Sequence, residues 1–479
     1  MTVTEGGGAV RVRRPLSPME RWYWICDQIS PLNVIARVHV TGAVTGEALS
    51  RAGARLTEEH PLLRVAVAVA PDGSRPRFVA AKDARIPVRT VRCDELAPEQ
   101  WEREVNDVEL VTPLEWHEGP LARIVDVAQG APGAAGECHD LILTVSHVIA
   151  DGTTAMELLR RLVELAAASA TAPPADAARP RRPLPPPEAL LPKRINGVPR
   201  TVHLIALVIA DQIALALARP RRLEPATPVP PALRRTRLIR HELDAAQLDA
   251  LVRQCRREGV TVHSALAAAM ALAVSGTAGQ AGHGARLTVG SPVDFRADLV
   301  PPVERRDAGA YVATVPSHVR VAPANGLWAV ARGAHRDLRR RKQLRQHLAL
   351  VSLLRFMAPR SVGRSARSVA MVDRVGPGNI CLSNIGRYDF PDRAGRWELS
   401  GAQFVAGISV SGYLVATVNT SHGALRWNFT YIDGAVPRDR AERIAHRAVR
   451  ILLSGLGPAG THAPAPGRAV MPGTTTTRG

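Results

Sequence analysis

The segment 146–152, which reads SHVIADG, most constrains the fold, because it places a histidine and an aspartate in a turn directly after an apolar run. Residues 141–145 have the length and composition of a buried strand, which would bring His147 to the end of a sheet. A helix is predicted next, since Thr154 and Glu157 have capping-box spacing and leucines follow at helical intervals. The segment therefore predicts a strand, a turn that carries histidine, and a helix.

The residue types in this turn suggest a division of labour. An imidazole with a pKa of about 6.5 can remove a proton from an alcohol or amine near neutral pH, so His147 is the candidate general base. Asp151 is expected to hold the turn by pairing with an arginine, because a guanidinium can donate two parallel hydrogen bonds to a carboxylate. Arg296, which follows another strand-like segment, is the candidate partner. Gly152 would permit a close backbone approach or a positive φ.

The residues alone leave other interpretations of this pair open. A histidine near a strand end is most often an ordinary hydrogen-bonded residue. His147 and Asp151 could also both bind a metal ion, but no nearby third ligand completes a zinc site, so we expect no metal. General-base catalysis is the third interpretation.

The HxxxDG pattern at His147 resembles the active-site motif of the coenzyme A-dependent acyltransferase superfamily, which also contains the condensation domains of peptide synthetases. Further blocks resemble that superfamily in the same order, over about residues 12–456. They are LSPMERW (16–22), HPLLR (60–64), GPLAR (119–123), SPVDFR (291–296), GAYV (309–312) and LSNIG (382–386).

The resemblance implies a role for each candidate site residue. His147 would be the general base, and Asp151, its partner in the motif, would be mainly structural and paired with Arg296. The acceptor would attack a bound thioester directly, without an acyl-enzyme, and hydrogen-bond donors would stabilise the oxyanion. Four polar residues are candidates for the oxyanion or tunnel positions: Ser383, Asn384, Ser409 and Ser411.

Two differences from other members of the superfamily narrow the choice of the branch that this chain resembles. Ser146 stands where condensation domains and wax ester or diacylglycerol acyltransferases usually carry an additional histidine, and the DFGWG block of the plant-type enzymes is absent. The chain is thus more similar to bacterial polyketide-associated acyltransferases. We expect transfer of an acyl group from acyl-CoA or an acyl carrier protein to a hydroxyl or amine of a secondary-metabolite or lipid acceptor. A free-standing condensation enzyme and a noncatalytic binding module are the alternatives.

The resemblance also implies an α/β fold with two chloramphenicol-acetyltransferase-like half-domains, each with a mixed sheet, and an active-site tunnel between them. A chain of 479 residues is long enough for two cores. We predict an N-terminal half-domain at 1–168 and a C-terminal half-domain at 234–457. Residues 169–233 would form a Pro- and Arg-rich linker with an apolar crossover segment, and 458–479 a disordered tail.

Charge and composition limit the partners. The net charge of +19, from 62 basic and 43 acidic residues, favours coenzyme A phosphates, an acidic carrier protein or an anionic membrane surface. An aromatic content of 4% argues against stacking on single-stranded nucleic acid. Five scattered cysteines and an N-terminus without the apolar core of a secretory signal lead us to expect a cytoplasmic protein, with peripheral membrane contact as an alternative. We also expect a monomer. No permanently bound cofactor is expected.

Two further segments each allow several interpretations. Residues 201–218 are mostly apolar, and a packed helix is favoured over a lipid-contacting surface helix or a membrane span. Residues 332–345 carry seven basic residues against one acidic residue. We expect a solvated helix face there, with docking of a carrier protein or of coenzyme A phosphates as the functional alternative.

Overall fold

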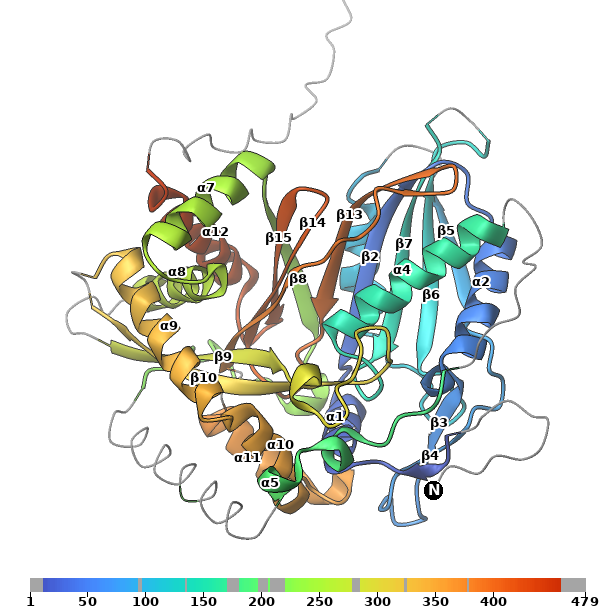
Figure 1. Cartoon of the computed structure of the whole chain (residues 1–479), viewed down its shortest axis with the longest axis horizontal. Helices are drawn as coiled ribbons and strands as arrows, with labels where there is room; N and C mark the ends of the chain where they lie inside the picture. The colour runs from blue at the N-terminus through green and yellow to red at the C-terminus, as the bar shows by residue number, and fades with distance from the viewer. Residues whose placement is uncertain are drawn as a thin grey trace, which may run out of the picture.

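The computed structural model describes residues 12–93, 97–133, 136–169, 181–196, 206, 220–277, 285–322, 325–376 and 379–457. Two six-stranded sheets, each covered by helices, stand side by side in Figure 1. The predicted α/β class with two mixed sheets is confirmed.

The first sheet contains one parallel strand pair, β5 with β6, and is otherwise antiparallel. Its central strands are apolar on both faces, which suits a sheet that helices cover on one side and the other half of the molecule covers in part. In spatial order its strands are β12 (Arg393–Ala394), β13 (Trp397–Ala406), β2 (Asn33–Thr41), β7 (Cys138–Ser146), β6 (Ala122–Gln129) and β5 (Val88–Cys93).

The second sheet is also mixed, because β11 runs parallel to both of its neighbours. β11 and β9 pair at one position only, Cys381 with Gly290, so the two strands diverge beyond it. In spatial order its strands are β10 (Val312–Val321), β9 (Ala285–Asp294), β11 (Ile380–Arg387), β14 (Leu414–Ser421), β15 (Ala424–Ile432) and β8 (Thr236–Leu243).

A small third sheet and the helices complete the described fold. The small sheet contains β1 (Arg14–Pro15), β4 (Arg77–Ala80) and β3 (Val65–Ala68). The helices are α1 (Pro18–Ile29), α2 (Gly46–Glu59), α3 (Gln100–Glu104), α4 (Gly152–Ser169), α5 (Lys193–Asn196), α7 (Ala245–Arg257), α8 (Val262–Thr277), α9 (Leu327–Gln343), α10 (Gln346–Met357), α11 (Ala366–Val375) and α12 (Arg438–Ser454). Single helical turns are η1 (Pro61–Arg64), η2 (Val105–Glu109), η3 (Pro187–Leu190), η4 (Pro231–Leu233), η5 (Arg296–Asp298) and η6 (Val362–Arg364).

The helices bury their apolar faces on the sheets. In Figure 1, α2 and α4 lie over the first sheet, and α8, α9 and α12 lie on the side of the second. The Ala-rich helix α8 is buried over most of its length, as its sequence predicts. Each sheet therefore has its own core, one gathered around α4 and the other around α8 and α12.

The C-terminal half supplies strands to the first sheet, because β12 and β13 come late in the chain yet pair there. The two sheets are joined along β13. Thr417 Oγ1 donates to the carbonyl of Phe404 at 2.8 Å, and Asn419 Nδ2 donates to that of Ala402 at 2.9 Å. The predicted C-terminal half-domain, 234–457, thus contributes two strands to the other sheet, a crossing that its sequence does not reveal.

The helix start after the histidine turn differs from the expectation. α4 begins at Gly152, and Asp151, rather than Thr154, accepts the capping hydrogen bond, from Thr154 N to Oδ1 at 2.9 Å. The hydroxyl of Thr154 instead donates to the carbonyl of Gly309. An aspartate at this position is a strong N-cap, and it satisfies a backbone amide that the helix leaves free.

Other expectations are met in part. Ser409 and Ser411, two of the oxyanion or tunnel candidates, lie in a turn between β13 and β14. The apolar segment 201–218, apart from residue 206, and the tail 458–479 lie outside the described residues, as do residues 170–180, 197–200 and 219 of the predicted linker. Those predictions therefore remain untested.

Candidate active site

β7 delivers His147 to the junction of the two halves. The strand is buried along its whole length, and its apolar side chains fix the direction in which the chain leaves the sheet. Ser146 N donates to the carbonyl of Leu121 at 3.0 Å, and His147 N donates to that of Leu32 at 3.3 Å. The backbone of the turn is thus tied to two neighbouring segments of the first half.

Asp151 and Arg296 form the predicted ion pair across the two halves. Arg296 Nη1 lies 2.9 Å from Asp151 Oδ2, and Nη2 lies 3.0 Å from Oδ1, so the contact is bidentate. Both side chains are buried. Asp151 Oδ2 also accepts a hydrogen bond from the amide of Tyr311 at 2.8 Å. Since the N-terminus of α4 supplies a further donor, both carboxylate oxygens are fully used.

The charge on this pair is fixed at neutral pH. Burial alone would raise the pKa of Asp151, but the charge and hydrogen bonds of Arg296, with amide donors from Thr154 and Tyr311, hold it below its ordinary value. Arg296 also donates to Asp294 Oδ2 at 2.9 Å and to Thr154 Oγ1 at 2.8 Å. The pair therefore remains ionised and connects β9, the loop before β10 and the start of α4.

Position 152 requires a glycine, because the side chain of Phe404 lies too close for a larger residue. A Cβ at this position would lie 2.5 Å from Cε2 of Phe404 on β13, which is fully buried. Of the two reasons that the sequence allows for this glycine, the structure shows the close contact; a positive φ is not present. β13, the strand that the second half supplies to the first sheet, thus packs directly against the turn that carries His147.

A cavity of about 130 Å³ lies beside His147, between the two sheets. Both halves supply its walls, and most of the wall residues are apolar. They are Trp22, Tyr23, Cys26, Leu32, Val34, His147, Asp151, Gly152, Thr153, Pro292, Val312, Thr314, Cys381, Ser383, Ile385, Phe404, Ala406, Gly407, Ser411 and Val415. An enclosed, largely apolar space of this kind restricts water and strengthens electrostatic interactions within it.

The imidazole of His147 is oriented by Tyr23 of α1. The two rings stack with centroids 4.2 Å apart and an interplanar angle of 13°. Burial lowers the pKa of His147, and the negative charge of Asp151 and the carbonyls of His147 and Ala150 oppose that shift only in part. Nδ1 is buried and has no hydrogen-bond partner among the described residues. The ring is therefore neutral at pH 7 and held in one plane.

The four oxyanion or tunnel candidates lie in different surroundings. Ser383 and Ser411 line the cavity with His147, but the hydroxyl of Ser411 donates to the carbonyl of Ile408 at 2.6 Å. Ser409 is buried outside the lining and donates to the carbonyl of Cys26 at 2.7 Å. Asn384 lines a second cavity. Of the four, Ser383 is therefore the one with a hydroxyl that faces His147's cavity and has no hydrogen bond to a described residue.

The wall of the cavity also contains two cysteines. Burial raises the pKa of the Cys381 thiol to about 12 and raises that of Cys26 further, with the charge of Asp27 adding to the effect. Since the thiolate is the nucleophilic form, neither sulfur is activated at neutral pH. All five cysteines are free thiols in the structure.

The comparisons with known proteins agree with this geometry. Residues 232–418 match the family model described as phthiocerol/phthiodiolone dimycocerosyl transferase C-terminus. That range contains Arg296 and Ser383, whereas His147 lies outside it. No curated protein matches the chain in sequence.

Solved structures with the same fold cover nearly the whole chain. Polyketide synthase associated protein 5 from Mycobacterium tuberculosis is 19% identical, with a TM-score of 0.63 over 93% of this chain and 99% of that chain. The TRI3 trichothecene 15-O-acetyltransferase from Fusarium sporotrichioides is 14% identical, with a TM-score of 0.72 over 95% and 97%. The epimerization domain of the third module of tyrocidine synthetase B is 15% identical, with a TM-score of 0.69 over 95% and 99%.

The family match covers less than half of the chain, and the solved structures establish its two-half fold. Because an epimerization domain has the same fold, the reaction of this protein must be argued from its site rather than from its architecture.

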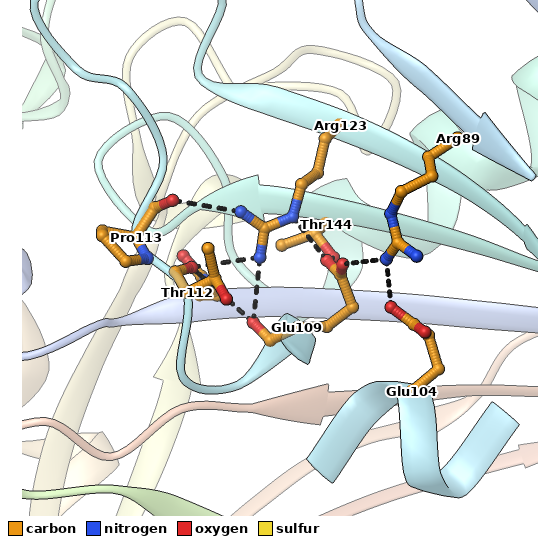
Figure 2. A network of polar contacts seen from close by, with 8 residues as sticks. Arg89, Glu104, Glu109, Thr112, Pro113, Arg123 and Thr144 are labelled. Atoms are coloured by element: carbon orange, nitrogen blue, oxygen red, sulfur yellow. Dashed lines mark hydrogen bonds and ion pairs between the residues drawn. The ribbon is translucent and has the colours of Figure 1, made fainter. Parts of the chain in front are cut away.

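A second buried carboxylate lies in the first half, outside the lining of the cavity. Figure 2 shows Glu109, at the end of η2, held by Arg123 Nε at 2.7 Å and by Thr144 and Arg89. The carbonyl of Glu109 accepts a hydrogen bond from Asn33 Nδ2 at 2.8 Å. Asn33 follows the residue whose carbonyl accepts from His147 N, so the backbone of Glu109 contacts a neighbour of the turn, whereas its carboxylate contacts arginines and Thr144 only.

Sequence reasoning missed several residues of the candidate site. Tyr23 follows the LSPMERW block, and Tyr311, whose ring lies under the Arg296 guanidinium at 4.7 Å, belongs to the GAYV block. Those blocks indicated that the segments matter, but not which contacts they make. Phe404 has no sequence signal, because its role depends on the strand crossing.

Metal centres and membrane-spanning helices are two further features that the described residues could contain. Among those residues, no group of three or more His, Cys, Asp or Glu side chains is arranged to hold a metal ion. No single described helix is long and apolar enough to span a membrane; only α7 and α8 taken together, at an angle of 98°, pass that test.

Proposed function

We propose that this protein transfers an acyl group from a thioester donor to a hydroxyl or amine, with His147 as the general base. One observation carries the proposal. His147 faces an enclosed cavity walled by both halves, while Asp151, its neighbour in the motif, is saturated by Arg296 and two backbone amides. The carboxylate is structural, and the imidazole is the group that can exchange a proton.

The proposed reaction needs one base and no covalent intermediate on the protein. Nε2 of His147 takes the proton of the acceptor as its oxygen or nitrogen attacks the thioester carbonyl. The tetrahedral intermediate then collapses, the carbon–sulfur bond breaks, and His147 returns the proton to the departing thiolate. Since Nδ1 is the buried ring nitrogen, Nε2 is the one available to the substrate. A positioned base of this kind contributes about 10²- to 10⁴-fold to the rate.

Direct attack is favoured over an acyl-enzyme by the state of the cavity thiols. Cys26 and Cys381 are the thiols in the wall, and burial keeps both protonated. For the oxyanion we propose the hydroxyl of Ser383, because it lines the cavity and its hydrogen is not donated to a described residue. A single such donor typically contributes about 10²- to 10³-fold.

The size of the cavity limits what lies in it. About 130 Å³ is less than the roughly 300–1,000 Å³ of typical ligand pockets, so only the reacting ends of donor and acceptor would fit beside His147. The name of the matching family mentions phthiocerol and phthiodiolone, and TRI3 is named as a trichothecene 15-O-acetyltransferase. We therefore propose a hydroxyl of a secondary metabolite or lipid as the first acceptor to test, and acyl-CoA or an acyl carrier protein as the donor.

The proposed setting follows from the same chemistry. We propose a cytoplasmic monomer without a permanently bound cofactor, because the thioester donor brings its own activated group. The positive charge of the chain would support contact with an acidic carrier protein or an anionic membrane surface.

The experiment is incubation of the purified protein with a panel of acyl-CoAs and acyl carrier proteins and with metabolite extract, followed by mass spectrometry. The expected result is an acylated product that disappears with His147→Ala. Products that form only from two carrier-bound substrates would support the condensation alternative. If the panel gives no His147-dependent product, the binding-module alternative replaces this proposal.

A further inference from the structure

Large apolar side chains are exposed at the end of α10 and on α11. Phe356 is 66% exposed, Met357 52% and Met371 40%. Because burying apolar area is favourable, three exposed side chains of this size in one short stretch of the chain indicate an interaction surface. In Figure 1, α10 and α11 lie at the same end of the molecule, away from α7.

Exposed arginines accompany these apolar side chains. Residues 355–374 contain five arginines and one acidic residue, Asp373. The carboxylate of Asp373 accepts two hydrogen bonds from Arg234, at 2.9 and 2.7 Å, so its charge is already compensated. Four of the five arginines are exposed, namely Arg360, Arg364, Arg367 and Arg374. We call these four arginines, with Phe356, Met357 and Met371, the α10–α11 surface.

α11 presents a basic and apolar face to solvent. Arg367, Met371 and Arg374 recur at helical spacing, so they lie on the same face of the helix, and all three are exposed. The connection that leads from α10 to α11 is fixed to α1, because Arg21 Nε donates to the carbonyl of Pro359 at 2.8 Å. The surface is therefore held in place before any partner binds.

The opposite face of α11 packs near the His147 cavity. Val369 is 4% exposed and belongs to one apolar cluster with Cys26 and Leu32. Cys26 and Leu32 are both in the wall of that cavity. The exposed face of α11 is thus separated from the cavity wall by the thickness of one helix.

We propose that the α10–α11 surface docks on an anionic lipid bilayer. The arginines would bind the phosphates of the headgroups, and Phe356, Met357 and Met371 would enter the boundary between headgroups and acyl chains. A lipid substrate would then leave the bilayer close to His147. The purpose of this docking rests on the proposed function, whereas the docking itself is measured without turnover.

Charge favours a bilayer over a second copy of the chain. In a symmetric dimer the same surface of each copy would face the other, so the four exposed arginines would meet four like charges. An anionic bilayer supplies the opposite charge together with an apolar layer beneath it. An acidic carrier protein is the other anionic partner, and the experiments below separate it from a bilayer.

The first test removes the apolar part of the surface. Phe356→Ser with Met371→Ser changes exposed side chains, so the variant should melt at the wild-type temperature. Binding is measured by cosedimentation with vesicles of phosphatidylcholine and phosphatidylglycerol. We expect the affinity to fall about tenfold or more, because less apolar area enters the bilayer. Leu233→Ser is the control, at a leucine of η4 that is 69% exposed, and it should bind like the wild type.

The second test removes positive charge. Arg364→Gln with Arg367→Gln should lower the affinity for the same vesicles about tenfold or more, because each arginine near an anionic surface strengthens binding. Arg256→Gln with Arg257→Gln makes the same charge change at exposed positions of α7 and should bind like the wild type. Vesicles of phosphatidylcholine alone, and high salt with anionic vesicles, should both weaken binding of the wild type.

Other occupants of the surface would give different results. A wild-type protein that does not bind anionic vesicles, or surface variants that bind them equally well, would overturn the proposal. A dimer in analytical ultracentrifugation that Phe356→Ser with Met371→Ser dissociates, without vesicle binding, would assign the surface to a second copy. A raised KM for a carrier-bound donor in the arginine variant, with unchanged vesicle binding, would assign it to a carrier protein.

His147→Ala separates this inference from the proposed function. This variant should bind anionic vesicles like the wild type, because the cavity is not part of the surface. Both surface variants should act on a soluble acceptor at the wild-type rate but lose about tenfold in rate on an acceptor held in anionic vesicles. Vesicle binding that depends on the surface, without any acyl transfer, would remove the proposed function alone. His147-dependent transfer without such binding would remove the docking surface alone.

Discussion

Two buried carboxylates, Asp151 and Glu109, are bound by arginines in different regions of the molecule. Glu109 takes Arg123 from 14 residues away, within the first half. Asp151 takes Arg296 from 145 residues away, in the other half, and it lies at a cavity beside His147. Both carboxylates are almost fully buried. Both ion pairs therefore stabilise the fold. Only the Asp151–Arg296 pair joins the two halves, and this position makes it part of the site.

The largest effect on stability should come from removing either carboxylate. We expect Asp151→Ala to lower the free energy of unfolding by about 3–5 kcal/mol, since the positive charge of Arg296 is left buried without its main partner. Activity should fall with it, because the turn and the opposite half are no longer joined. Thermal or denaturant unfolding, with turnover of the folded fraction, measures both effects.

Glu109→Ala is the matched control for this comparison. It should cost a similar free energy of unfolding, because Arg123 and Thr144 lose their acceptor, but the remaining folded enzyme should stay active. An Asp151→Ala protein that is as stable as the wild type but inactive would break the comparison and make Asp151 a participant in the chemistry.

A smaller effect is expected where the strand crossing presses on the turn. Gly152→Ala should destabilise the protein by about 1–3 kcal/mol, because its Cβ would collide with the buried ring of Phe404. Gly333→Ala, on α9 with open space around the new Cβ, is the control and should be neutral or stabilising by up to about 1 kcal/mol. Equal melting temperatures for the two variants would show that β13 does not constrain the turn.

Acidity should affect activity through His147, which lies at the cavity with Asp151. Burial lowers the pKa of His147 below 6.5, so the neutral base persists at pH 7 and kcat/KM should fall only as the pH drops below about 6.5. The unfolded chain binds that proton more readily than the folded chain, so the contribution of His147 to stability is also lost as the pH falls through this range. An acid limb with its midpoint above pH 7 would contradict a buried, neutral His147.

The smallest effect is expected from the ring that orients the base. Tyr23→Leu should lower kcat about twofold to tenfold, because the stacked contact with His147 contributes roughly 0.5–1.5 kcal/mol. Tyr23→Phe keeps the ring and should stay within about twofold of the wild type. If Phe and Leu variants lose the same activity, the hydroxyl of Tyr23, rather than its ring, is the important group.

The sequence predicted the parts of the site that are local. The apolar run before His147, the turn and the following helix are adjacent in the chain, and their hydrophobic pattern determines them. The pairing of Asp151 with Arg296 was also predicted, because a buried carboxylate needs a cation and the SPVDFR block supplies one. The capping residue was misassigned, since Thr154 matches the capping pattern although Asp151 makes the bond.

Long-range packing could not be predicted from the sequence in the same way. The contact of Phe404 with Gly152, the stack of Tyr23 and the entry of β13 into the first sheet all depend on how distant segments pack, and no local pattern encodes that. The separation of Ser383 from Asn384 was within reach, because alternation along a strand puts consecutive residues on opposite faces. Ser409 and Ser411 differ in their place relative to the cavity and in their hydrogen-bond partners, neither of which the sequence shows.

The central claim is that His147, and not the saturated Asp151, moves the proton in acyl transfer. It is tested most directly by the single-turnover rate of thiol release from a bound acyl thioester in the presence of acceptor, compared between the wild type and His147→Ala. The account predicts a fall of about 10²- to 10⁴-fold with an unchanged melting temperature. A folded His147→Ala protein that releases thiol and forms product at the wild-type rate would contradict it.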